Sequence, residues 1–333
     1  MPTYLFLGPL NREYILPPQG KPLLDVPGGE VLYAAAGAAL WGAEVGLISR
    51  VGEDFPQTWL DDLAARGWDV RGVRRLPEPL ETRRVLVYEP SGRLSPQSPL
   101  AAFARRGITF PKSLLNYNPP PVQRANLDKP TPTSLRISDL PPNFGDARAA
   151  HFCPHDFLTH SLLPAALRTA GVPIITLAPH SAYMTALFYD RLPALLTGLT
   201  AFIVTEAQLR AVFRERTSDL WEMAETLGQW QVRYVVIRRA EGEVWLYDVN
   251  GNRRWVVPGY PTRMVDPTGA DDAFAGGFLV GYRETLDPVQ AVVQGAVSAS
   301  LAVETRGALA LLDTLPALVS RRAEVVSASV QQV

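Results

Sequence analysis

The chain has a single cysteine, Cys153, among its 333 residues, so it cannot form an intrachain disulfide, and a reducing compartment suits it. Long hydrophobic runs are also missing, since no apolar stretch reaches the roughly 18 residues that a membrane span requires. The first residues place no cationic segment ahead of a long apolar run, as a secretory leader would. From these absences we expect a cytoplasmic protein that does not bind a membrane.

The chain also has almost no net charge. It carries 32 Lys plus Arg against 33 Asp plus Glu, a formal net charge of -1, and no basic patch is evident, so we expect no nucleic-acid partner. A hydrophobic share of 47% excludes a disordered chain, a coiled coil and a collagen. The length allows two ordinary domains or one large α/β domain with an appendage, and we predict one domain over residues 1–333.

Short apolar runs rich in β-branched and aromatic residues alternate with longer stretches of helical period, which predicts a parallel sheet flanked by helices. Late in the chain, Asn250-Gly251 suits a tight hairpin turn because both residues tolerate positive φ. Two helices, 270–282 and 288–304, are expected to close the chain. The expected strands are Tyr4–Leu7, 44–49, Ala149–Phe152, Ile174–Leu177, 202–204, 234–237, 244–247 and 254–257, and the other expected helices are 31–41, Gln57–Ala65, 162–169, 206–213 and 220–227.

One segment is unusually rich in proline. Eleven of the thirty prolines fall between Pro90 and Pro142, with three in a row at Pro119–Pro121. Proline has no amide proton and a fixed φ, so continuous helix or central strand is not expected there. A long irregular segment of this kind, about residues 90–147, is either a functional flap or a poorly ordered insertion.

The segment with the clearest chemistry is 265–282, VDPTGADDAFAGGFLVGY. Its apolar and small residues fall at helical spacing, so residues 268–272 are expected to form a first helical turn. The first amides of a helix have no partner inside it and carry the positive end of its dipole, which makes such a turn an anion site. A carboxylate at Asp272 would lie beside the bound group and could accept a hydroxyl proton during phosphoryl transfer.

A simpler interpretation is that Asp271 and Asp272 only complement the dipole of an ordinary helix. The whole string favours the functional one. Residues 266–278, DPTGADDAFAGGF, resemble the late signature D-T-x-G-A-G-D-x-F-x-G-G-F of the ribokinase-like, or PfkB, family of carbohydrate and nucleoside kinases. The family's earlier landmark is matched by Gly28-Gly29 and by LWGAEVGLISRVGEDF at 40–55, and its opening strand with a following acid by Gly8 and Glu13.

This resemblance spans nearly the whole chain. It implies a three-layer α/β/α sandwich with a mainly parallel central sheet and a small β lid, formed by segments of about 10–27 and 81–100. It also implies ATP and Mg²⁺ as cofactors and a sugar or nucleoside as the small-molecule substrate. Lids in this family often pair, which implies a homodimer through the lid.

The resemblance also assigns roles to individual positions. Asp272 matches the catalytic base, and the amides around it match the anion hole for the transferred phosphate. The remaining matches lie on the substrate side and the nucleotide side; no metal ligand is assigned. The residues are Gly269, Ala270 and Asp271 for the anion hole, Glu13, Gly28, Gly29 and Tyr33 for the substrate, and Thr205, Arg238 and Thr268 for the nucleotide.

Several matched positions depart from the family. Asp271 replaces a glycine, and a second negative charge about 4 Å from a phosphate would be repelled by roughly 4 kcal/mol at an effective dielectric of about 20. This cost falls if the side chain points to solvent or meets a bound metal ion. Tyr33 replaces a sugar-binding asparagine and suits a base or apolar ring better than a polyol. Gln208 replaces the glutamate of N-x-x-E, which is associated with magnesium. Arg238 stands where T-x-G is usual, and it either grips phosphate or ends a strand in solvent.

A metal site elsewhere is a weaker alternative. His151, Cys153 and His155 alternate and would share one face of an extended strand, but Pro154 interrupts the run.

The resemblance and its departures leave two candidate functions. The first is an ATP-dependent phosphotransferase with Asp272 as base, and the second is a catalytically impaired relative that binds a ligand or regulates, as the changes at Thr205, Gln208 and Asp271 would allow.

Overall fold

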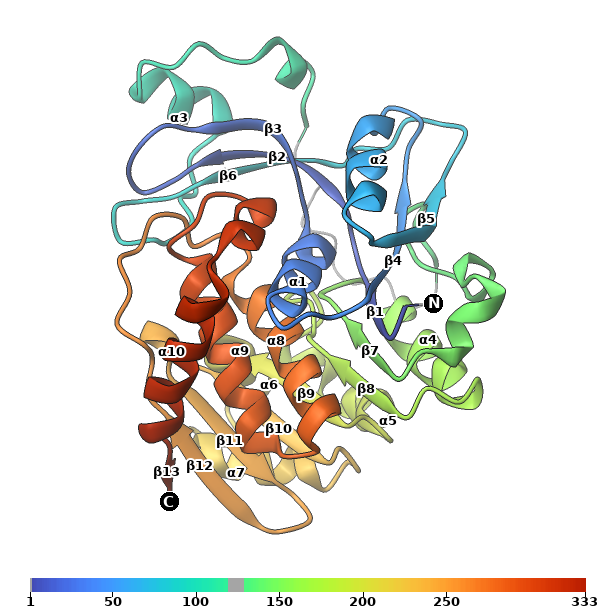
Figure 1. The fold of residues 1–333 in the computed structure, drawn as a ribbon, viewed down its shortest axis with the longest axis vertical. Coiled ribbons are helices and arrows are strands. Elements are labelled where there is room, and N and C mark those ends of the chain that lie inside the picture. Colours follow the sequence, from blue (N-terminus) through green and yellow to red (C-terminus); the bar gives the residue numbers. More distant parts are fainter. Residues whose placement is uncertain (1, 119–128) are drawn as a thin grey trace.

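The computed structural model describes residues 2–118 and 129–333. Its centre is a ten-stranded sheet (Figure 1). The strands from β10 to β5 run parallel to their neighbours, and β11, β12 and β13 extend that sheet as an antiparallel edge. In spatial order they are β13 (Gln331–Gln332), β12 (Arg253–Val257), β11 (Val244–Asp248), β10 (Tyr234–Arg238), β9 (Ala201–Thr205), β8 (Ile174–Leu177), β7 (Ala149–Phe152), β1 (Tyr4–Leu7), β4 (Val45–Val51) and β5 (Asp69–Arg75).

Helices cover both faces of this sheet, and each face has its own buried apolar cluster. The predicted three-layer α/β/α arrangement with a mainly parallel sheet is confirmed. On one face lie α1 (Glu30–Ala39), α2 (Gln57–Ala65), α8 (Ala270–Thr285), α9 (Pro288–Ala302) and α10 (Pro316–Ala328). On the other lie α4 (Phe157–Thr169), α5 (Leu192–Leu196), α6 (Glu206–Val212) and α7 (Leu220–Gly228).

Small residues allow α8 to pack closely between α1 and α9. A Cβ added at Gly276 would overlap the carbonyl of Ala34 in α1, and one at Gly277 would overlap Ser298 in α9. Gly276 and Gly277 therefore leave room for this close packing. Because α8 is held on two sides, its first turn has a defined position above the sheet.

A smaller three-stranded sheet lies apart from the main one (Figure 1). Its order is β3 (Leu23–Gly28), β2 (Asn11–Leu16), β6 (Arg83–Val87), and these strands come from the two segments in which lid strands were predicted. The helix α3 (Pro99–Arg105) and a turn at Lys112–Leu114 pack on one face of this sheet, where Tyr14, Leu16 and Val87 are buried. We refer to β2, β3 and β6 as the small sheet.

Some local predictions were wrong. A short helix, α3, does form in the proline-rich segment, because Pro99 stands at its first position, where no amide is needed, and Ser98 caps it. The hairpin between β11 and β12 closes through four residues, with positive φ at Asn252 instead of a tight Asn250-Gly251 turn. The chain continues beyond α9 into α10 and β13. Pro119–Pro121 lie outside the described residues.

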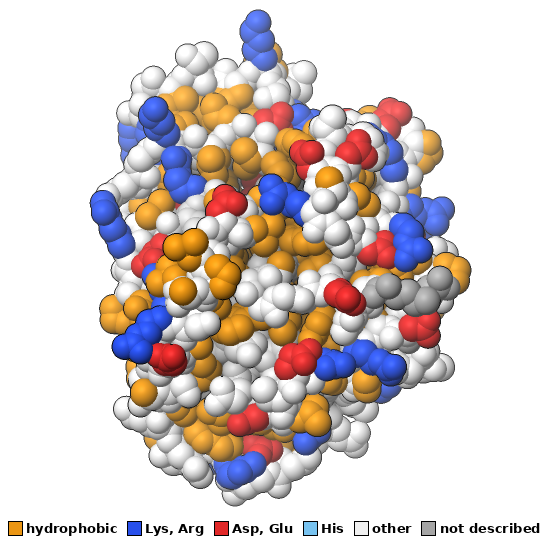
Figure 2. All heavy atoms as spheres, in the orientation of Figure 1, with side chains coloured by type: hydrophobic (Ala, Val, Ile, Leu, Met, Phe, Trp, Pro, Cys, Tyr) orange, Lys and Arg blue, Asp and Glu red, His pale blue; other side chains and the backbone are white. Residues whose placement is uncertain are grey.

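Figure 2 shows basic and acidic side chains interspersed over the face that it displays. Among residues 2–118 and 129–333, no helix combines the length and the apolar character that a membrane crossing needs.

Candidate active site

The site predicted from the sequence lies where the parallel strands end at their carboxyl side. Thr205 ends β9, Arg238 ends the neighbouring β10, and the first turn of α8 approaches this edge, where Arg238 contacts Asp271. In open α/β sheets ligands bind at this edge. Residues distant in sequence, from β2 to α8, are thereby brought together.

The first turn of α8 has uncapped amides. Within the described chain no side chain caps this helix, and of the amides of residues 269–272 only that of Ala270 has an acceptor, the Pro267 carbonyl at 3.4 Å. Gly269 has φ of 72°, and a Cβ there would overlap the ring of Tyr33. Glycine is therefore required at 269 both by the backbone and by the packing of Tyr33. The free amides can accept an anion.

Asp272 follows these amides as the third residue of α8. Its side chain keeps some accessible surface, yet enough protein surrounds it that desolvation raises the pKa of the carboxyl well above its usual value. The negative charges of Glu30, Asp271 and Glu13 raise this pKa further, and the guanidinium of Arg84 lowers it. A carboxyl with a raised pKa is a better proton acceptor once it is ionised.

Glu13 is buried beneath the start of α1, with 1% of its surface exposed. Its Oε1 accepts a hydrogen bond from the Gly29 amide and its Oε2 one from the Tyr33 hydroxyl, each at 3.0 Å. A Cβ at Gly28 would overlap the same carboxylate. Burial raises the pKa of Glu13 to about 7, against the lowering effect of Arg84. The four residues predicted on the substrate side, Glu13, Gly28, Gly29 and Tyr33, therefore form one contiguous cluster.

Two further residues of this cluster were missed by the sequence reasoning. Arg84 on β6 donates from Nη1 to Glu30 Oε1 at 2.5 Å, so a strand of the small sheet is joined by an ion pair to the start of α1. The charges of Glu30, Glu13 and Asp272 all raise the pKa of Arg84. Glu30 directly follows Gly28-Gly29 and could have been identified from that position, whereas no motif marks Arg84.

On the nucleotide side, the additional aspartate is paired. Arg238 Nε donates to Asp271 Oδ1 at 3.2 Å, and the guanidinium also lies over the Phe274 ring, 4.2 Å from its centroid. The repulsion expected between Asp271 and a phosphate is thus partly offset by a neighbouring cation. Both residues line a cavity of about 480 Å³, together with Thr205, Glu206, Ala207, Arg210, Arg239 and Ala240.

The other predicted nucleotide-side residues have structural contacts. The Thr205 hydroxyl accepts from the Gln208 amide at 3.2 Å, and Gln208 Oε1 accepts from the Thr205 amide at 3.0 Å, which closes a capping box on α6. The Gln208 side-chain amide donates to the Pro179 carbonyl at 2.9 Å. Thr268 is buried and donates to Asp266 Oδ1 at 2.6 Å, with its hydroxyl 3.0 Å from that of Tyr88.

The cavity suits a polyphosphate better than it suits a metal ion held by protein alone. Arg238 has a buried Nη1 without a hydrogen-bond partner in the described chain, and such a donor can bind a phosphate oxygen. No group of three or more metal-ligating side chains exists among residues 2–118 and 129–333. Mg²⁺ typically needs only one or two carboxylates besides substrate phosphates, and Asp271 and Glu206 line this cavity.

The histidines near β7 have other partners. His151 Nδ1 lies 2.8 Å from Thr176 Oγ1, and burial lowers the pKa of His151 to about 3. His155 Nδ1 lies 2.5 Å from Asp156 Oδ2, and Cys153 is buried. His151 and His155 therefore have separate hydrogen-bond partners.

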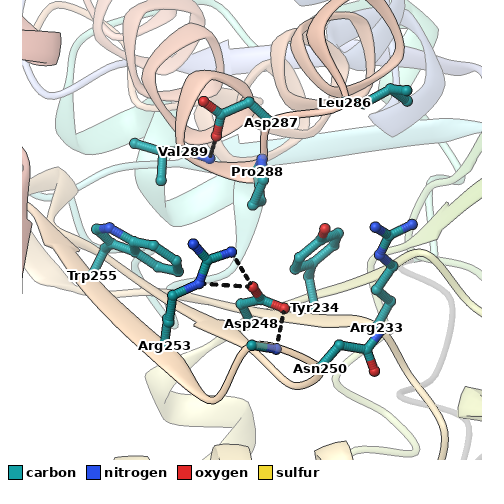
Figure 3. Close-up of a pocket in the computed structure, with 11 residues that line it drawn as sticks. Arg233, Tyr234, Asp248, Asn250, Arg253, Trp255, Leu286, Asp287, Pro288 and Val289 are labelled. Atoms are coloured by element: carbon teal, nitrogen blue, oxygen red, sulfur yellow. Dashed lines mark hydrogen bonds and ion pairs between the residues drawn. The ribbon is translucent and has the colours of Figure 1, made fainter.

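A larger cavity, of about 580 Å³, lies away from this chemistry (Figure 3). Arg253 and Asp248 form an ion pair along one side of it, and Asp287, Pro288 and Val289 lie across from them. Leu286 and Asp287 follow the last turn of α8, whereas Asp271 and Asp272 lie in its first. Sixteen residues of helix, about 24 Å, separate the two cavities, so the larger one is not part of the candidate site.

Comparison with solved structures defines the class of fold. The ATP- and Mg²⁺-bound structure of an Escherichia coli protein assigned as ribokinase II aligns with a TM-score of 0.71 at 19% identity, over 98% of this chain and 100% of that one. The nucleoside kinase of Burkholderia thailandensis in complex with inosine aligns with a TM-score of 0.66 at 19% identity, over 97% and 98%. The chain therefore has the ribokinase-like fold.

Sequence comparison leads to the family. Residues 161–315 match the model of the pfkB family carbohydrate kinases. The cytidine kinase of Thermococcus kodakarensis is 28% identical over 280 residues, which cover 83% of this chain and 87% of that protein. The uncharacterized sugar kinase YegV of Escherichia coli is 36% identical over 123 residues, 35% of this chain and 37% of that one. The resemblance to the PfkB family is confirmed, and these relatives support a kinase function.

Proposed function

We propose that the protein is an ATP-dependent phosphotransferase that transfers the γ-phosphate to a hydroxyl of a sugar or nucleoside. The observation that carries this proposal is the first turn of α8, where uncapped amides lie beside Asp272, whose pKa is raised. Sugar and nucleoside kinases among the relatives support the same reaction.

In the proposed mechanism, each group has a separate task. Asp272 accepts the proton of the acceptor hydroxyl, and the amides of residues 269–272 stabilise the charge of the transferred group. Glu13, oriented by the Gly29 amide and the Tyr33 hydroxyl, accepts hydrogen bonds from other hydroxyls of the substrate. ATP would supply the phosphoryl group, and a bound Mg²⁺ would neutralise the charge of the phosphates.

We further propose a nucleoside as the acceptor, and we place cytidine first. The similarity to a cytidine kinase covers most of both chains. The experiment is a panel of nucleosides and sugars, incubated with ATP and Mg²⁺, in which ADP formation is followed. ADP formation that depends on one hydroxylated compound is expected. If compounds of the panel raised the melting temperature of the protein without any ADP formation, the proposed reaction would be contradicted.

The ion pair between Arg84 and Glu30 leads to a prediction on pH dependence. Arg84→Met removes the charge that lowers the pKa of both Asp272 and Glu13, so the acid limb of the kcat/KM profile is expected to move to higher pH, by about one unit. The matched control is Arg83→Met, because Arg83 adjoins Arg84 on β6 but pairs with Glu81. An acid limb that stays in place or moves to lower pH would contradict the assigned effect of Arg84.

The homodimer expected through the lid would need an open face on the small sheet. The face of the small sheet that carries Tyr14, Leu16 and Val87 is covered by α3, whose Phe103 is fully buried there. We therefore propose that the proline-rich segment takes the place of a partner on this face. Light scattering after size exclusion is expected to give a mass near 36.5 kDa, and a value near twice that would support pairing.

A second candidate function, a binding protein without catalysis, is favoured by one observation. Gln208 and Thr205 are engaged in a capping box and in a bond to Pro179, and neither supplies the carboxylate associated with magnesium. Binding of a nucleoside without any effect of ATP and Mg²⁺ on its affinity would support this function over the kinase.

A further inference from the structure

We propose that Arg238 and Asp271 form an exchangeable ion pair, in which a phosphate of the nucleotide displaces Asp271 and takes its place on Arg238. This inference rests on the proposed function and deepens its nucleotide side. Asp271 would thus act as an internal competitor for the guanidinium that binds the polyphosphate.

Arg238 has the properties of a ligand-binding arginine. It ends β10 with only 7% of its surface exposed, and it lines the cavity of about 480 Å³. Its Nε donates to Asp271, whereas its buried Nη1 has no partner in the described chain. A buried donor left unpaired costs free energy, and a phosphate oxygen in the cavity would satisfy it. Packing over Phe274 holds the guanidinium plane in position.

The other two arginines of the cavity are already paired. Arg239 donates to Glu206 and to Glu243, and Arg210 donates to Glu206 and to the Ser218 carbonyl. Their positive charge is balanced by these acids. Arg238 is therefore the cavity arginine with a side-chain nitrogen that has no partner among the described residues.

Asp271 is a weakly held partner. Its side chain is 62% exposed, and one hydrogen bond of 3.2 Å joins it to Arg238. An ion pair with one exposed member contributes at most about 1 kcal/mol, because water competes for the carboxylate. A terminal phosphate carries more charge and can accept two parallel bonds from a guanidinium, so it is the stronger ligand.

The position of the pair connects it with the anion hole. Asp271 is the second residue of α8, so its carboxylate extends from the same turn whose amides are free. Displacing the carboxylate removes a negative charge from beside Arg238 as the phosphate arrives. Without a ligand, the carboxylate of Asp271 therefore balances the charge of Arg238. When a phosphate binds, the carboxylate moves away and the guanidinium charge is available to the phosphate.

The test measures binding without turnover. The non-hydrolysable analogue AMP-PNP is titrated into the full chain by calorimetry in EDTA, so that metal plays no part. Arg238→Met is expected to weaken binding by about 10-fold or more, the size of a lost bond to a charged group. Asp271→Asn is expected to tighten it by about 3-fold, because the competitor's charge is gone. In the double variant the second effect should vanish.

The controls separate this effect from damage to the fold. Arg239→Met removes the same charge from the same cavity but from a paired arginine, and it should change the affinity less than 3-fold. Adenosine should bind to Arg238→Met as it does to the unaltered chain, since adenosine has no phosphate; an equal loss for adenosine would overturn the proposal.

The remaining outcomes are distinct. Weaker binding by Asp271→Asn would show that Asp271 positions Arg238, and it would overturn the competitor role while leaving the kinase in place. An unchanged affinity of Arg238→Met would overturn the phosphate contact. If the unaltered chain bound neither AMP-PNP nor inorganic triphosphate in EDTA, this inference would be wrong; if binding also failed with Mg²⁺ present, the use of ATP would be wrong as well.

Discussion

Asp272→Asn is expected to lower kcat by about 10²- to 10⁴-fold, the contribution of a well-placed general base. Asparagine has nearly the same shape but cannot accept the hydroxyl proton. Binding of nucleotide and acceptor should change little, so the loss should appear in kcat and not in KM. The measurement is steady-state ADP formation with the best compound of the acceptor panel.

The same variant should be more stable at neutral pH. Burial and three neighbouring acids raise the pKa of Asp272 in the folded state, so its ionised form opposes folding above its unfolded pKa of about 4. Asparagine removes that penalty, and the melting temperature at pH 8 should rise. Asp62→Asn, on the exposed side of α2, is the control for both measurements. Full activity in Asp272→Asn would exclude Asp272 as the base.

Glu13→Gln has the second largest expected effect, a loss of acceptor affinity of about 10- to 150-fold. Hydrogen bonds to a charged group contribute about 1.5 to 3 kcal/mol each, and the neutral glutamine amide loses this contribution. Because the pKa of Glu13 is about 7, acceptor affinity in the unaltered protein should also weaken as the pH falls through 7. In the variant this dependence should disappear.

Stability provides an independent measurement on Glu13. Its pKa is raised from 4.5 to about 7 on folding, which corresponds to about 3 kcal/mol at about 1.4 kcal/mol per unit. The folded state binds the extra proton, so the unaltered protein should lose stability as the pH rises from about 5 to 8, and Glu13→Gln should lose less. Chemical denaturation at both pH values, with Glu53→Gln as the exposed control, measures the difference. Parallel pH profiles would contradict the raised pKa.

Much of the core could be predicted because its strands are short, fully buried and bounded by turn residues. The bounds of β1, β7 and β8 agree with the expected ones, since all residues of these strands are buried and apolar runs identify them. The hairpin after β11 was harder, because several turn types fit Asn250-Gly251 and the strand register selects one of them. The last helix, α10, has a weak apolar face and was missed.

The candidate site also has features that the sequence predicts and features that it does not. The string from Asp266 to Phe278 predicts a helix start with free amides and an acid beside them, because these features follow from spacing along one segment. The sequence could not predict the side-chain orientation of the residues that differ from the family pattern. Asp271 was expected to repel a phosphate, and only the structure shows it paired with Arg238.

The sequence by itself determined the class of fold, the first turn of α8 and the place of Asp272 in it, since local spacing controls local backbone geometry. The tertiary structure alone decided which charges meet. Arg84 and Glu30 are 54 residues apart, and they pair because β6 of the small sheet lies beside the start of α1. Arg238 and Asp271 are 33 apart, and they pair because the end of β10 and the start of α8 converge at one edge of the main sheet. That convergence depends on the packing of the whole chain, which no single segment specifies.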